Sequence, residues 1–394
     1  MNILVANLGS TSFKFRLFRF EAAGAVLLAK GGSERVTDYG RAIDDCLAEL
    51  KAAGHVRSAA DLHGVGFKTV LGRNLTGCVP ADDRVIAALE GFREIAPAHN
   101  PPYAEGIRRF HEKLPGVPLV ALFETAFYQW MPEAATRYAV PDAWHQAGVR
   151  RYGFHGASHK FVAERSAELL GRGDVAERVR QLYQAGPTPV GGPPLRVVSC
   201  HLGGSSSITG IRDGVAVGTS MGLSPQSGLP QNNRVGDLDS AAVPFVLKTF
   251  NLPLAEVERQ MTKEGGLLGL SGVGNDLRDI RAAAAAGNAR ARLALEVFVH
   301  SARHWLGAFL LELGGCEAVV FTAGIGENSP DIRAAILRDL GALGIALDPA
   351  RNEALRGAEG EISAPGSRVR VLVIPANEEL VVARETLRCL AARN

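Results

Sequence analysis

The sequence predicts an α/β protein in which one domain has been duplicated, because the same opening pattern occurs twice along its 394 residues. Each half begins with three short apolar or alternating runs joined by tight turns, which is typical of consecutive strands. The runs are residues 3–7, 13–20 and 25–29 in the first half and residues 195–200, 207–211 and 215–219 in the second. The cleft between two such copies is a natural place for a ligand.

Alternation within the second run supports a strand. Phe13, Phe15 and Leu17 share one face, whereas Lys14 and Arg16 share the other, which is the period of two that a strand requires. The small residues before this run form the turn that separates it from the first strand.

Helical spacing marks two other segments. Residues 41–53 repeat apolar side chains at helical intervals, and residues 287–313 do so over a longer stretch, which we interpret as core packing. Residues 184–194 are dense in Gly and Pro instead, so we expect an exposed loop inside the second half.

Composition excludes several classes of protein. Apolar residues make up 46% and charged residues 21%, the formal charge is +2, and no cluster of Lys and Arg stands out, so we expect no nucleic-acid partner. No stretch of about 18 apolar residues occurs, and no basic start precedes an apolar run, so we expect a cytoplasmic protein without a membrane span. The five cysteines are scattered singly, which fits free thiols better than disulfides or a zinc site.

Phosphate binding, if present, must come from turns rather than from a P-loop, whose sequence pattern is absent. Three Gly/Ser-rich turns, at residues 7–12, 201–206 and 322–328, could direct backbone N–H groups at an anion. Any one of them alone is more often a plain hairpin turn. Two of the three stand at equivalent points of the duplicated unit, and together they favour nucleotide binding.

The third turn has further content. An apolar strand at residues 318–321 runs into it, and a helix start follows, with Asn328 or Ser329 as the cap. Gly324 and Gly326 would let the backbone approach a nucleotide closely. A plain strand-to-helix connection would need fewer glycines.

Basic residues gather in two places that suit phosphoryl transfer. Residues 150–159 contain two His and two Arg, and Arg234 follows a loop rich in Gly, Pro and Asn. Phosphoryl transfer needs donors aimed at the moving oxygens and little covalent chemistry from the protein. An Arg with a His beside it fits that need, although a lone His in such a loop is more often structural.

Several segments together resemble a known family. They are NLGSTSFKF at 7–15, HNPP at 99–102, RYGFHGASHK at 151–160, CHLGGSSSI at 200–208, GDLD at 236–239, FTAGIGENS at 321–329 and PANEELVVARET at 375–386. In content and in order, nearly from end to end, the chain resembles the acetate kinase family.

The resemblance implies an α/β fold with duplicated actin-like ATPase domains, of the acetate and sugar kinase type, that flank an interdomain cleft. We expect residues 1–126 with the C-terminal residues 380–394 to form the first domain, and residues 127–379 to form the second. The second domain would bind the nucleotide and mediate a homodimer. ATP and Mg²⁺ would be the cofactors, and a small carboxylate the substrate.

The resemblance also implies roles for matching residues. Glu124, His155 and Arg234 would be catalytic, the last two by stabilising the transferring phosphoryl group. The acid would be held by Lys68, Val70, Ala98, His99, Phe154 and Pro225. The nucleotide would be held by Ser10, Ser12, Lys14, His201, Gly203, Gly204, Ser205, Asp276, Leu277, Arg278, Gly324, Ile325, Gly326, Glu327 and Asn328. Asn7 and Glu378 would organise Mg²⁺, which keeps several waters and binds substrate phosphates.

Three departures from the family pattern lie near the expected acid site. Lys68 stands where the family has an Arg that grips the substrate carboxylate, and Arg73 is a nearby basic group that would compensate. Glu124 replaces the catalytic Asp, and a displacement near 1 Å costs roughly a hundredfold in rate. Tyr128 replaces a His.

Other departures lie in the phosphate turn and the acyl pocket. The family's H-L-G-N-G reads His201 to Ser205 with Gly204 in place of Asn, so Ser205 is the candidate substitute donor. The family's M-G-T-R reads Gln-Asn-Asn-Arg at 231–234. Ala98 stands where a larger Leu is common, so a longer acyl chain is expected to enter.

These patterns predict phosphoryl transfer from ATP to acetate or a similar acid. Two alternatives remain open: a different acyl acceptor or donor, such as pyrophosphate, and a nucleotide-binding actin-like protein with impaired catalysis. Asp276 and Arg278 favour a nucleoside over pyrophosphate, and the departures at Lys68, Glu124 and Gly204 favour impairment.

Overall fold

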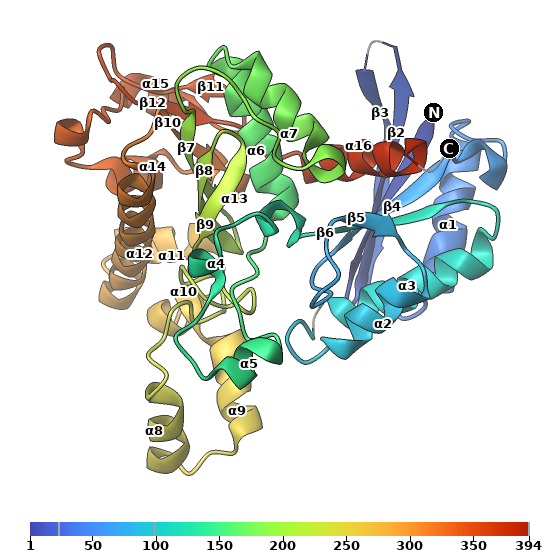
Figure 1. Ribbon diagram of the computed structural model, residues 1–394. Helices are drawn as coiled ribbons and strands as arrows, with labels where there is room; N and C mark the ends of the chain where they lie inside the picture. The colour runs from blue at the N-terminus through green and yellow to red at the C-terminus, as the bar shows by residue number, and fades with distance from the viewer. Residues whose placement is uncertain (23, 98, 393–394) are drawn as a thin grey trace.

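The computed structural model describes residues 1–22, 24–97 and 99–392, which form two six-stranded sheets flanked by helices (Figure 1). The first sheet contains β1 (Asn2–Gly9), β2 (Ser12–Glu21), β3 (Gly24–Glu34), β4 (Gly64–Thr69), β5 (Cys78–Pro80) and β6 (Leu119–Phe123). The second contains β7 (Arg196–Leu202), β8 (Ser206–Arg212), β9 (Val215–Thr219), β10 (Ala318–Thr322), β11 (Gly360–Glu361) and β12 (Arg370–Val373).

The two sheets share one topology. The first has the order β3-β2-β1-β4-β6-β5 and the second the order β9-β8-β7-β10-β12-β11. In both, the first three strands pair antiparallel, the next two join in parallel, and the last is an antiparallel edge. This identity of order confirms the duplicated α/β fold.

Helices cover the sheets and connect them. Those of the first half are α1 (Tyr39–Ala52), α2 (Asp83–Gly91) and α3 (Asn100–Lys113). The middle of the chain forms α4 (Glu133–Thr136), α5 (Asp142–Gln146), α6 (Gly156–Leu169) and α7 (Gly173–Ala185). The rest are α8 (Ala242–Thr249), α9 (Leu254–Arg259), α10 (Gly266–Ser271), α11 (Leu277–Ala285), α12 (Ala289–Leu313), α13 (Ala323–Asn328), α14 (Pro330–Leu337), α15 (Pro349–Ala354) and α16 (Glu378–Ala391). Short 3₁₀ turns (Ala59–Asp61, Ala126–Tyr128 and Gly341–Leu343) and one π-turn (Gln260–Glu264) complete the set.

Most elements predicted from the sequence are confirmed. The six strands predicted in the two openings occur as β1–β3 and β7–β9, and the strand predicted at residues 318–321 is β10. The long stripe is α12, whose Phe298, Leu306 and Phe309 are buried in the second core. The Gly- and Pro-rich segment is an irregular, mostly exposed connection after α7. Among the described residues, no helix is both long and apolar enough to cross a bilayer.

The third Gly-rich segment was predicted as a turn, and this prediction is wrong. It forms the short helix α13, and α14 begins directly afterwards with Ser329 as its N-cap. Neither Asn328 nor Ser329 makes a side-chain capping bond to α14. The Asn328 amide donates instead within α13, to Gly324 O at 3.0 Å. Glycine disfavours a helix, so the glycines of this segment led the sequence analysis to predict a turn.

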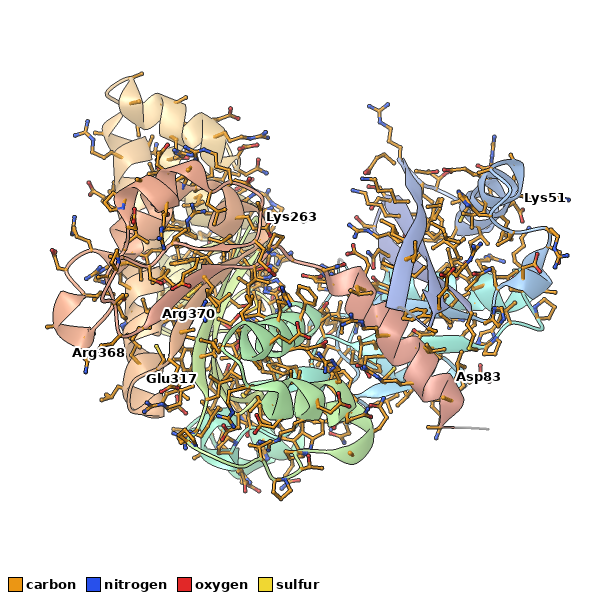
Figure 2. The ribbon with its side chains drawn as sticks, turned by 90° about the horizontal axis from the view of Figure 1, so that it is seen from above. Lys51, Asp83, Lys263, Glu317, Arg368 and Arg370 are labelled. Carbon is orange, nitrogen blue, oxygen red and sulfur yellow. The ribbon has the colours of Figure 1, made fainter. Side chains whose placement is uncertain are left out.

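The C-terminal helix α16 joins the two halves (Figures 1 and 2). It packs on β1, β4 and β6 of the first sheet and on α6 of the second half. At this contact Lys160 Nζ of α6 lies 2.9 Å from Glu385 Oε1 of α16, and both side chains are buried. Gln184 and Arg388 also donate to the Glu385 carboxylate.

We expect the change Lys160→Met to lower the free energy of unfolding by about 3 kcal/mol, because it leaves a carboxylate buried without its principal cation. Arg388 and Gln184 remain, which keeps the loss from being larger. Urea denaturation followed by circular dichroism measures the difference. Lys113→Met is the matched control, since its ion pair with Asp44 is exposed and contributes about 0–1 kcal/mol. Equal losses in the two variants would contradict the assignment.

Candidate active site

A half-buried lysine lies where three elements meet. Lys68 comes from the end of β4, Glu124 directly follows β6, and Glu378 is the first residue of α16. Lys68 Nζ donates to Glu378 Oε2 and lies 3.5 Å from Glu124 Oε1. Burial acts to lower the pKa of Lys68, but the two carboxylates outweigh it and raise that pKa well above its ordinary value. The ammonium is therefore permanently charged.

Glu124 is fixed by its backbone while its carboxylate is unsatisfied. Its N–H donates to Thr69 O at 2.8 Å, and its carbonyl accepts from Gly156 N at 3.1 Å. A Cβ at Gly156 would lie 2.1 Å from that carbonyl, so only glycine fits there. Neither carboxylate oxygen has a hydrogen-bond partner among the described residues. Burial raises the pKa of Glu124 to about 7, although Lys68 acts in the opposite direction.

Two histidines stack beside these groups. The rings of His155 and His201 lie 4.1 Å apart with an interplanar angle of 17°. His155 precedes α6 in a left-handed conformation with φ of 59°, which is rare for a residue with a side chain and is held by its surroundings. Burial lowers the pKa of His201 to about 4 and that of His155 well below its ordinary value. Both imidazoles are therefore neutral near pH 7.

A serine links His155 to a third histidine. The Ser207 hydroxyl lies 2.8 Å from His155 Nδ1 and 2.8 Å from His159 Nε2, and His159 Nδ1 lies 2.8 Å from Ser199 Oγ. Because one hydroxyl donates a single proton, it accepts from one ring and donates to the other. The tautomers of the two imidazoles are therefore linked. When Ser207 donates to Nδ1, His155 presents Nε2–H as a donor.

Arg234 is held by polar groups of its own loop. Its Nη1 donates to Gln231 Oε1 at 3.2 Å and to Pro225 O at 3.3 Å, and it lies 3.5 Å from Ser205 Oγ. The Ser205 hydroxyl itself donates to Gln231 Oε1 at 2.6 Å. Ser205 was considered as a substitute phosphate donor, but the structure shows its proton engaged by Gln231.

His99 is electrostatically close to both cations. Burial, Arg234 and Lys68 together lower the pKa of His99 to about 4, so this imidazole is also neutral. Val70 and Phe154, expected in the acyl wall, are buried, and Pro225 is half-buried. Ala98 lies outside the described residues.

A cavity of about 530 Å³ opens at the ends of β7 and β10. It is lined by Gly203, Gly204, Asn232, Asp276, Leu277, Arg278, Arg281, Gly324, Ile325, Asn328 and Ser329. Most residues expected to hold the nucleotide therefore surround one space. Asp276 caps α11 by accepting from the backbone N–H of Arg278 at 2.8 Å, and a Cβ on Gly324 would meet nothing within 4 Å.

Other expected nucleotide ligands do not line this cavity. Ser10 and Ser12 lie at the β1–β2 turn, and Lys14 is exposed and pairs with Glu34 at 3.1 Å. In α13, Gly326 is buried against Phe321. The Glu327 carboxylate instead accepts from Ala376 N at 2.9 Å.

The donor set at Asn7 and Glu378 fits Mg²⁺. Asn7 Nδ2 donates to Glu379 Oε1 at 3.2 Å, and Arg16 binds the other Glu379 oxygen at 3.4 Å. This leaves Asn7 Oδ1 buried without a partner among the described residues. An orphaned amide oxygen and a carboxylate are hard oxygen ligands, and Mg²⁺ needs few of them when phosphates and waters complete its shell. Glu379, which the sequence did not single out, positions this amide.

Comparison with known proteins shows which family the chain belongs to. The Acetokinase family matches residues 31–384. The acetate kinase of Geobacillus kaustophilus is 40% identical over 410 residues, and the alignment covers 98% of each chain. The acetate kinase structure of Porphyromonas gingivalis superposes with a TM-score of 0.87 at 34% identity over 99% of both chains. A propionate kinase structure from Francisella tularensis superposes with a TM-score of 0.84 at 30% identity, covering 98% of this chain and 99% of the other.

The chain belongs to the acetokinase family.

Within the acetokinase frame, two of the three departures near the expected acid site contact each other. Lys68 and Glu124 form an ion pair. Arg73, considered as a replacement cation, instead donates to Gln146 O at 3.2 Å. The Tyr128 hydroxyl donates to Phe154 O at 2.5 Å and so holds the residue before His155. Tyr128 therefore has a structural role in this chain.

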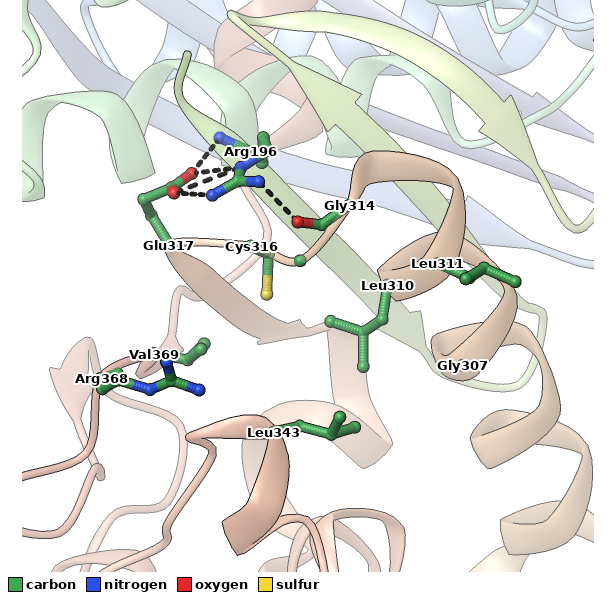
Figure 3. Close-up of a pocket in the computed structure, with 11 residues that line it drawn as sticks. Arg196, Gly307, Leu310, Leu311, Gly314, Cys316, Glu317, Leu343, Arg368 and Val369 are labelled. Carbon is green, nitrogen blue, oxygen red and sulfur yellow. Dashed lines mark hydrogen bonds and ion pairs between the residues drawn. The ribbon is translucent and has the colours of Figure 1, made fainter. Parts of the chain in front are cut away.

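A second cavity lies at the opposite ends of the strands of the second sheet (Figure 3). Arg196, which lines it, begins β7, and Glu317 directly precedes β10, whereas the 530 Å³ cavity lies at the other ends of these strands. Leu310, Leu311 and Leu343 make it largely apolar, and Arg196 is engaged by Glu317 at 2.6 Å. It is separate from the acetokinase site.

We expect the free energy of unfolding of the wild type to fall, relative to that of the Glu124→Gln variant, as the pH rises from about 4.5 to about 7. In this window the folded chain keeps a proton on Glu124 that the unfolded chain has released, so raising the pH favours unfolding. The difference is on the order of 3 kcal/mol across the window. Urea denaturation at half-unit steps measures it. The exposed Glu133→Gln serves as control, and parallel profiles for all three proteins would show that Glu124 titrates normally.

Proposed function

We propose that this protein transfers the γ-phosphoryl group of ATP, with Mg²⁺, to acetate or a similar short-chain acid, giving an acyl phosphate and ADP. Membership of the acetokinase family makes the chain a phosphotransferase with a carboxyl acceptor. The observation that carries the specific proposal is Lys68, a half-buried, permanently charged ammonium that lies 3.5 Å from the Glu124 carboxylate, whose pKa is raised. A small acid anion is the natural partner of such a cation.

Lys68 would orient the acid with its ammonium, which donates to Glu378. Glu378 and Asn7 would hold Mg²⁺, and the metal would supply charge neutralisation for the phosphates. Glu124, neutral through much of the range below pH 7, would add a hydrogen bond rather than a repulsive charge.

Arg234 and His155 would stabilise the moving phosphoryl group. An oxygen of the acid attacks the γ-phosphorus as the bond to the β-phosphate oxygen breaks, and the negative charge is spread over the equatorial oxygens. Arg234 donates from its half-buried loop, and neutral His155 donates through Nε2 when Ser207 donates to its other nitrogen. Donors fixed before the reaction need no rearrangement during it.

The contact between Lys68 and Glu124 supports catalysis over the alternative of an impaired nucleotide-binding protein. Lys68 is basic like the Arg that it replaces, and Glu124 is acidic like the Asp that it replaces. Pyrophosphate as donor is less well supported, since the cavity beyond Gly203 and Gly204 extends to Asp276 and Arg278 and has room for a nucleoside. We place the reaction in the cytoplasm, where ATP is available.

Purified protein with Mg²⁺, ATP and hydroxylamine should give acyl hydroxamate with acetate, propionate or butyrate as substrate. Arg234→Ala should lower kcat by about 10²–10³-fold, because one preorganised donor to the transition state is lost. Arg137→Ala, which removes an exposed arginine paired with Glu133, is the matched control and should retain activity.

Ranking the acids tests the acyl pocket in the same assay. A small residue at position 98 is expected to favour the longer acids, with one methylene changing kcat/KM by roughly 10-fold. Preference for acetate would contradict the enlarged pocket but not the kinase. Absence of product from every acid, with ATP still bound, would contradict the kinase.

We also propose a homodimer that forms through α8 and its surroundings. None of the residues of α8 is buried although the helix is largely apolar, and Phe245 and Phe250 are 65% and 64% exposed. The helix extends away from the second sheet (Figure 1). An apolar helix exposed in this way is typical of a protein interface.

Phe245→Glu should convert the dimer to a monomer, because it places a charge in the apolar contact. Light scattering after size-exclusion chromatography measures the mass. Leu27→Glu is the control, since Leu27 is an exposed apolar residue of β3 in the other half and should leave the dimer intact. A monomeric wild type, or a dimeric Phe245 variant, would contradict the proposed interface.

A further inference from the structure

Gly204 and Asn232 lie against each other in the wall of the cavity. The Asn232 N–H donates to Gly204 O at 3.1 Å. A Cβ built on Gly204 would lie 3.1 Å from Asn232 Nδ2, which is tighter than ordinary contact, and 3.5 Å from its Cγ. The Asn232 side chain therefore fills the space into which a side chain at position 204 would extend. Glycine at 204 is what makes room for it.

The backbone of Asn232 is firmly placed. Leu268 N donates to Asn232 O at 2.9 Å, and Leu267 N donates to the preceding carbonyl, that of Gln231, at 2.8 Å. Both donors belong to α10, so the loop is anchored to a helix. By contrast, the Asn232 side-chain amide makes no hydrogen bond to the described residues, and it lines the cavity. It is a positioned donor with its hydrogen-bonding capacity unused.

Its neighbours indicate which part of a nucleotide it meets. Gln231, the preceding residue, binds both Ser205 and Arg234, the proposed contact of the transferring group. Asp276 and Arg278 lie elsewhere on the cavity wall, at the start of α11. Asn232 thus shares the cavity wall with Asp276 and Arg278, bonds the backbone of Gly204, and follows the residue that holds Arg234. A phosphate chain that runs from the nucleoside toward Arg234 would pass it.

We propose that Asn232 donates its side-chain amide to the polyphosphate of the nucleotide and takes the place of a donor at position 204. The inference rests on the proposed function, because it assumes that the cavity receives ATP or ADP. It also accounts for two sequence departures at once: where the family pattern has Asn at 204 and Gly at 232, this chain has the reverse. The donor has moved from one loop to the other.

Four proteins test this exchange: wild type, Asn232→Gly, Gly204→Asn and the double variant. Isothermal titration calorimetry with ADP and with a non-hydrolysable ATP analogue, both with Mg²⁺, gives Kd without requiring turnover. Asn232→Gly should weaken both ligands by roughly 10-fold, the effect of one hydrogen bond to a charged group. Gly204→Asn alone should weaken them too, because two amides compete for one space. The double variant should return to within about 3-fold of wild type, a non-additive result.

Adenosine and a neighbouring variant make the test specific. Adenosine lacks phosphates, so its Kd should be unchanged in Asn232→Gly, and an equal loss with adenosine would overturn the proposal. Asn233→Gly introduces the same backbone freedom one residue away and should bind ADP like wild type. Should Gly204→Asn fail to fold, the comparison of ADP with adenosine in Asn232→Gly decides the question alone.

The outcomes separate this inference from the proposed function. If wild type binds ADP and forms acyl hydroxamate while Asn232→Gly binds ADP equally well, the inference is wrong and the kinase stands. If wild type binds no nucleotide, both are wrong. Loss confined to the phosphorylated ligands and recovered in the double variant supports the exchange.

Discussion

The structure depends on a half-buried ammonium shared between two carboxylates. Lys68 belongs to the first sheet, Glu124 leads out of it toward α6, and Glu378 begins the helix that spans both halves. Two carboxylates with one cation leave an excess of negative charge, which burial of Glu124 resists. The raised pKa of Glu124 is the response of the protein: one carboxyl is kept protonated at moderate pH while Glu378 stays ionised. A divalent cation held by Glu378 would complete this balance in another way.

The same dry environment explains why the site contains neutral histidines beside charged arginine and lysine. Imidazolium ions at His155 and His201 would face each other at stacking distance and face Lys68 as well, so burial and like charge both oppose protonation. A neutral imidazole can donate only from one nitrogen, and its direction must therefore be set from outside. Ser207 and His159 supply that setting, because the Ser207 hydroxyl bonds both rings and links their tautomers.

Sequence reasoning found the fold because strand periodicity and its repetition survive without tertiary information. It also found most of the cavity wall, since residues at the carboxyl ends of β7 and β10 necessarily share an edge of the sheet. It failed where the outcome depends on a contact between distant segments. Nothing in the pair Glu378-Glu379 says which carboxylate meets Lys68 and which holds Asn7. Likewise the sequence left the Ser205 hydroxyl as a candidate phosphate donor, and only the fold shows that it donates to Gln231 Oε1.

The contacts between replaced residues bear on whether the chain is a working enzyme. Random loss of function would remove single groups and leave their partners orphaned. Here Lys68 is shorter than an arginine and Glu124 longer than an aspartate, and the two meet. Gly204 lacks a side chain where Asn232 has one, and the two fit together. Tyr128 bonds the carbonyl that orients the segment of His155. In the first two cases the change on one element lies against a change on another, which favours a retuned site over an abandoned one.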